Sequence, residues 1–135
     1  MIEVLLQAIS EKYSSNTQLK NALTGGLWFT QAPEENAMPY AVMYYIGDSN
    51  FELMGGVNDR EITVEIQVNI FSDKTDGGFE LLRLIRFFKE AFDWQILNIA
   101  GYKCIKVQNT VNTGINYIDE IWQTNLVYEI GLIKE

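Results

Sequence analysis

Paired and clustered carboxylates are the side chains of this sequence with the most obvious chemical potential. Adjacent acidic residues occur at Glu34-Glu35 and Asp119-Glu120, and Asp73 and Asp76 flank Lys74. General acid–base catalysis needs two carboxyl groups that face a cleft in different environments, whereas neighbours on predicted loops face water. The acids around Lys74 lack the Asp-x-Asn/Asp-x-Asn/Asp-Gly spacing of a calcium loop. We therefore expect neither a catalytic pair nor a metal site.

The residues that most often perform nucleophilic catalysis are scarce. The chain has no histidine, which removes the usual general base near neutral pH and excludes Ser-His and Cys-His pairs. Cys104 is the only cysteine, so it can form neither an intrachain disulfide nor a thiolate metal site alone. We expect it to be a half-buried strand residue, and we expect a protein that is not an enzyme and binds no cofactor.

Three glycine pairs, at Gly25-Gly26, Gly55-Gly56 and Gly77-Gly78, fit no phosphate-binding fingerprint. The last pair precedes a predicted helix, whose N-terminus could hold an anion. No lysine with serine or threonine follows at phosphate-loop spacing, so all three pairs are interpreted as turns.

Composition predicts one folded domain spanning residues 1–135. Hydrophobic residues make up 47% of the chain and charged residues 21%, which favours a packed core. No apolar stretch approaches the ~20 residues of a membrane helix, and the start lacks a basic signal-peptide flank, so a cytoplasmic origin is expected. The net charge of −8 repels nucleic acid; it serves solubility, or forms a surface past which DNA slides without sticking.

The strongest structural signal is the alternation of apolar and polar residues from Ile62 to Ile70, which predicts a strand with one buried face. Periodicity predicts further elements in chain order: a helix over 2–13, strands over 27–30 and 40–46, a connection over 47–59, a helix over 79–92, and strands over 102–111 and 121–133. Asn16 or Thr17 is expected to cap a short additional turn. The predicted fold is an α+β two-layer sandwich of order α-β-β-β-α-β-β. It has a mostly antiparallel sheet of four to five strands and two long helices packed on one face.

Several apolar residues exceed what this core requires. Residues 40–46 are apolar on both strand faces, the 47–59 connection is unusually apolar, and two phenylalanines lie outside the helical core stripe. The candidates for subunit or partner contact are Tyr40, Val42, Tyr44, Phe51, Leu53, Met54, Phe79 and Phe87. The alternative for the connection residues is that they fold back onto their own domain.

Three segments carry a resemblance to a known family. Ala32-Pro33 is followed by Met38-Pro39-Tyr40-Ala41-Val42, Arg60 leads into the strand 64–72, and Tyr117 leads through Trp122 to a closing strand ending at Ile130. In order and spacing these resemble the tail completion (tail terminator, or head–tail joining) proteins of long-tailed bacteriophages and prophages.

The resemblance implies a structural virion protein located in the tail or neck and assembled in the bacterial host cytoplasm. Such proteins form a ring, commonly a hexamer, on the head-proximal end of the tail tube. The ring ends tube growth and docks to the head connector or neck protein, and DNA passes through without specific binding. No membrane is involved. Glu61 and Glu65, on the polar face of the long strand, are the candidates for facing the opening.

Two other functions remain open at this stage. The three tryptophans, seven tyrosines and seven phenylalanines could line the pocket of a small-ligand-binding or enzymatic α+β domain. Another neck or tail-tube component is the second alternative.

Overall fold

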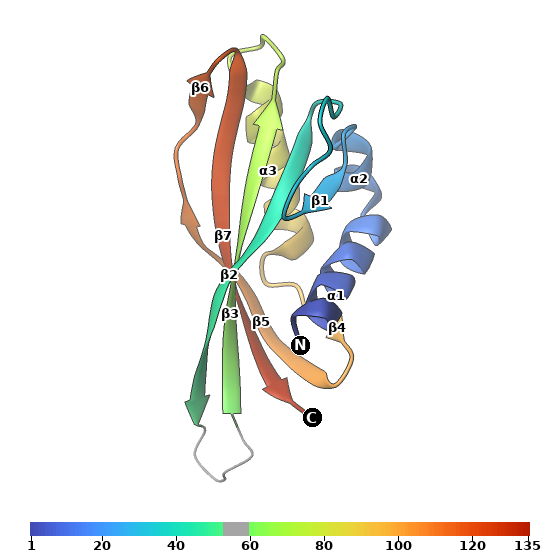
Figure 1. Cartoon of the computed structure of the whole chain (residues 1–135), viewed down its shortest axis with the longest axis vertical. Helices are drawn as coiled ribbons and strands as arrows, with labels where there is room; N and C mark the ends of the chain where they lie inside the picture. Colours follow the sequence, from blue (N-terminus) through green and yellow to red (C-terminus); the bar gives the residue numbers. More distant parts are fainter. Residues whose placement is uncertain (53–59) are drawn as a thin grey trace.

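The computed structural model describes residues 1–52 and 60–135 (Figure 1). The helices are α1 (Ile2–Ser15), α2 (Thr17–Ala22) and α3 (Phe79–Phe92). The strands are β1 (Leu27–Phe29), β2 (Tyr40–Glu52), β3 (Arg60–Ser72), β4 (Asn98–Ile99), β5 (Tyr102–Asn112), β6 (Asn116–Ile118) and β7 (Ile121–Lys134). The mixed helix-and-sheet class is as predicted.

All seven strands belong to one twisted sheet, in the order β1-β2-β3-β7-β5-β4, with β6 also paired to β7. Among the strand pairs of the described residues, β1–β2 is parallel and the others are antiparallel. The long strands β2, β3, β7 and β5 form its centre, as Figure 1 shows.

The predicted number of strands and helices needs correction. In the described part of the chain the sheet has seven strands where four to five were expected, because β4 and β6 span two and three residues and leave no periodicity of their own. Two helices have 14 residues each, and α2 adds a third of six residues. Asn16 caps α2, since its Oδ1 accepts a hydrogen bond from the backbone N–H of Leu19 at 2.9 Å.

The predicted connection over 47–59 is also too long. β2 continues through Glu52 and pairs with β3, with Gly47 opposite Glu65 and Ser49 opposite Thr63. A β-bulge between Tyr45 and Gly47 inserts Ile46, which shifts the alternation by one residue and hides the continuing strand from a period-two pattern. In Figure 1 the paired lower ends of β2 and β3 extend beyond the N-terminal end of α1.

The core lies between one face of the sheet and the helices. Val64, Ile66, Val68 and Ile70 of β3 are at most 1% exposed, as the alternation predicts. The helices supply the opposite wall with these buried residues: Leu5, Ile9, Leu19, Leu81, Leu84, Phe87, Phe88 and Phe92.

Phe87 was predicted to lie on a polar flank of its helix, and this is wrong. The ring is 8% exposed and belongs to the core, with the Arg86 guanidinium 5.2 Å from its centroid. The reason is that α3 contacts α1 and α2 as well as the sheet, so its buried stripe is wider than a sheet alone would require.

Candidate assembly surface

The face of the sheet opposite the core carries mostly polar residues. In β3 these are the odd-numbered positions, and Glu61, Thr63, Glu65, Gln67 and Asn69 are all half-buried. Cross-strand partners place Asn125 and Glu129 of β7 on this same face. The face therefore presents a polar surface, and it carries both of the acids predicted to face an opening.

Negative charge is concentrated at one end of this polar face. Glu65 lies directly opposite Glu129, which is an unfavourable cross-strand pair. The Lys106 Nζ lies 3.8 Å from Glu129 Oε2 and offsets part of that charge. Glu61 reaches the same area, because its carboxylate and the Lys106 side chain both lie over Gly131. A Cβ atom added to Gly131 would be 3.2 Å from Oε1 of Glu61 and 3.1 Å from Cγ of Lys106.

At the other end of the polar face, the contact residues predicted on β2 are half-buried or buried within the chain itself. Tyr40 stacks on Phe71 with ring centroids 4.9 Å apart, and both Tyr40 and Tyr44 are half-buried. Val42 lies between Trp28 and Asn69 in register and is only 3% exposed. Val42 therefore offers almost no surface to another molecule in the isolated chain.

The remaining predicted contact residues are dispersed. Phe79 is 71% exposed at the start of α3, whereas Phe87 is in the core. Leu53 and Met54 lie outside the described residues, and Phe51 is described only by its backbone position opposite Glu61. Among the candidates whose side chains are described, the structure does not bring all into one patch: Phe79 is exposed on α3, whereas Phe87 and Val42 are buried.

Sequence reasoning missed several exposed apolar side chains. They lie in the connection after α3 and on the edge formed by β5 and β6: Trp94, Ile96, Val111, Tyr117 and Ile118. Tyr45 and Ile46, within the strand noted as apolar on both faces, are also exposed. The β6–β7 hairpin was hidden because its turn, Asp119-Glu120, adopts φ values of 53° and 65° without the glycine or asparagine that marks such turns.

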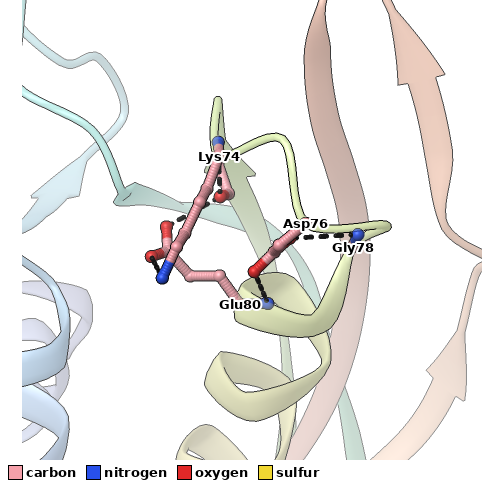
Figure 2. A network of polar contacts seen from close by, with 5 residues as sticks. Lys74, Asp76, Gly78 and Glu80 are labelled. Atoms are coloured by element: carbon pink, nitrogen blue, oxygen red, sulfur yellow. Dashed lines mark hydrogen bonds and ion pairs between the residues drawn. The ribbon is translucent and has the colours of Figure 1, made fainter.

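The N-terminus of α3 is closed to anions by its own turn (Figure 2). The Asp76 carboxylate accepts hydrogen bonds from the backbone N–H groups of Gly78 at 3.2 Å and Glu80 at 3.0 Å. Beside it, the buried Ser72 hydroxyl donates to Glu80 at 2.7 Å, and Lys74 lies 4.0 Å from the same carboxylate. This network fulfils the expectation that Gly77-Gly78 is a turn.

The interior offers little room for a ligand. One apolar cavity of about 10 Å³, the volume of roughly one water molecule, lies beside Tyr128. The hydroxyl of Tyr128 is buried without a hydrogen-bond partner. Among the described residues, no cluster of histidine, cysteine and acidic side chains could hold a metal ion, and no helix could cross a membrane.

Comparison with known proteins identifies the fold. No protein-family model matches the chain, and no curated protein matches it. A chain from the virion of a native gene transfer agent particle superposes with a TM-score of 0.70 at 8% identity, covering 93% of this chain and 92% of that one. A second solved chain, known only by a sequence number, gives a TM-score of 0.72 at 12% identity over 100% and 97% of the two chains. At these identities the likeness establishes a shared fold over nearly the whole length.

Proposed function

We propose that this protein is a structural component of a phage-like particle. It forms a ring, in our proposal a hexamer, on the head-proximal end of the tail tube, where it ends tube growth and joins tail to head. The observation that carries the proposal is the near full-length fold shared with a chain of a gene transfer agent virion. The ordered sequence resemblance to tail completion proteins supplies the finer role.

The charge distribution supports a passage for DNA. Glu61, Glu65 and Glu129 share the polar face, where the Lys106 ammonium group lies 3.8 Å from Glu129. If this face lines the opening, the carboxylates repel phosphate and leave DNA free to move without specific binding. The tail-tube protein and a head connector or neck protein are the proposed partners.

A ring also requires two different contact surfaces on each subunit, because its interfaces are head-to-tail. The exposed apolar side chains fall on separated parts of the molecule, with Tyr45 on β2 and Tyr117 on β6. That distribution suits two distinct interfaces better than one self-complementary patch.

The test is to measure the mass of the purified protein in solution and its binding to tail-tube ends. We expect either a closed oligomer in solution or one that forms on the tube. A variant with Glu61→Gln and Glu65→Gln should still assemble, because these acids are assigned to the opening. A strict monomer that also fails to bind tube ends would overturn the proposal.

A further inference from the structure

Each of the two edges of the sheet is covered along part of its length and open along the rest. On one edge, β1 pairs with β2 from Ala41 to Met43, and the N–H of Thr30 donates to the Met43 carbonyl at 2.9 Å. On the described part of the chain, no strand pairs with this side of β2 beyond Met43. The edge is therefore open from Tyr44 onward.

The opposite edge has a longer cover. β4 pairs with Tyr102 and Lys103 of β5. The N–H of Trp94 then donates to the Val107 carbonyl at 2.6 Å, and Asp93 accepts a hydrogen bond from the N–H of Asn109 at 3.0 Å. This cover ends at Asn109, and the outer side of β6 has no strand partner among the described residues.

Backbone alternation identifies the groups that face outward at both openings. The Ala41 N–H and the Met43 carbonyl bond toward β1, so Tyr45 is the next residue whose backbone points away from β3. In the β6–β7 hairpin, the two-residue turn makes Ile118 and Ile121 the hydrogen-bonded pair. Tyr117 is then the residue whose N–H and C=O point away from β7.

The side chains at both openings are apolar and solvent-exposed. Tyr45 and Ile46 are 43% and 48% exposed, and Tyr117 and Ile118 are 50% and 53% exposed. Proteins usually protect an open edge with charge, proline or a covering segment. The four side chains are themselves uncharged and have no covering strand in the described part of the chain. On the β2 edge, the exposed Asp48 carboxylate accepts a hydrogen bond from the Tyr45 hydroxyl at 2.8 Å.

The strand directions make the two openings complementary. β2 is antiparallel to β3, β3 to β7, and β7 to β6, so β2 and β6 run in opposite directions within one subunit. Placing β6 of one copy beside β2 of a second copy in the same orientation thus gives an antiparallel ladder. It also leaves the same two edges free for the next copies, as a head-to-tail contact requires.

The register of this contact agrees with closure. Within one subunit, Tyr117 pairs with Trp122, and Trp122 pairs with Ser72, the residue after the partner of Tyr40. Tyr117 therefore lies at a level one residue beyond Tyr40. That level is about six residues, or ~20 Å, from Tyr45 along the strand direction. Across four strands, about 19 Å wide, this offset corresponds to a strand tilt of roughly 45°, which is close to that of closed barrels.

We propose that the open edge of β2 around Tyr45 pairs with β6 of a second copy around Tyr117, so that the sheets of successive subunits join into one. This inference rests on the proposed ring and specifies its subunit contact.

Cross-linking tests the contact directly. In a Cys104→Ala background, Tyr45→Cys and Tyr117→Cys are combined, and the assembled protein, free or on tube ends, is treated with a short bis-maleimide. We expect a covalent ladder up to the full ring. The matched control combines Tyr45→Cys with Trp94→Cys, an exposed residue on the covered edge, and should give no ladder.

Hydrogen exchange on the unmodified chain provides a second measurement that needs no substitution. The amides of Tyr45 and Tyr117 should exchange rapidly in the monomer and at least ten times more slowly in the assembly. Assembly with neither a ladder nor this protection would overturn the β2–β6 contact while leaving the ring proposal standing. Absence of any assembly would overturn both.

Discussion

The two faces of the sheet differ in what stabilises them. On the helix-covered face, β3 side chains such as Ile66 and Ile70 are at most 1% exposed and pack against α1 and α3. On the polar face, the neighbouring positions Glu65 and Gln67 remain half-buried and meet polar partners from β7. The same strand therefore provides folding energy on one side and a surface for assembly on the other, and the predictions below test that division.

Truncating Phe88 should have the largest effect. Its ring is fully buried in the core, so Phe88→Ala should lower the free energy of unfolding by about 3–5 kcal/mol, measured by urea denaturation. Phe79→Ala is the matched control on the same helix. Its ring is 71% exposed, so the change should stay within about 0.5 kcal/mol. Equal losses in the two variants would contradict the division.

Tyr128→Phe should be neutral or stabilising by about 1 kcal/mol, because it removes a buried hydroxyl that has no partner. Burial, and secondarily the charge of Asp93, raises the pKa of Tyr128. Above pH 10 the unfolded chain ionises while the folded phenol stays protonated. The free energy of unfolding therefore does not depend on this group below pH 10 and falls as the pH rises above 10, by up to about 1.4 kcal/mol per unit.

Denaturation curves between pH 8 and pH 11 measure this contribution as the difference between wild type and Tyr128→Phe. The difference should shift with rising pH in favour of the variant. A difference that stays constant over this range would show that the phenol is not held protonated in the fold.

Asp76→Ala should cost about 1 kcal/mol, because it leaves the N–H groups of Gly78 and Glu80 without their acceptor at the start of α3. Asp76→Asn is the conservative comparison and should retain part of the stability, since its amide oxygen can still accept. Thermal unfolding measures both changes. An unchanged midpoint for Asp76→Ala would show that the cap contributes nothing.

Glu65→Gln should have the smallest effect, a gain of a few tenths of a kcal/mol that fades at high salt, because it removes repulsion from Glu129 across the strands. Glu129→Gln should gain less, since it also removes the partner of Lys106. Denaturation at two ionic strengths measures the pair. If Glu65→Gln instead lowers the free energy of unfolding, repulsion between Glu65 and Glu129 does not destabilise the fold.

Local pattern was sufficient where an element is long and regular. β3, α3 and β7 show uninterrupted periods of two or 3.6 residues, so their positions and most of their buried residues could be predicted. Prediction failed at the β-bulge after Tyr45, at the short strands β4 and β6, and at Phe87. Each of these depends on a partner that is distant in sequence.

The candidate surface divides in the same way. That Glu61 and Glu65 share a polar face followed from alternation alone, because side chains of a strand must point to opposite sides. Which of the apolar side chains remain exposed was decided by the fold: Val42 is covered by its neighbours, whereas Tyr45 and Tyr117 lie at open edges. The alternation of apolar and polar residues thus determines which face of the sheet a residue belongs to. Whether that residue is buried or lies at an open edge depends on the strand order and on what packs against the sheet, and only the tertiary structure supplies these.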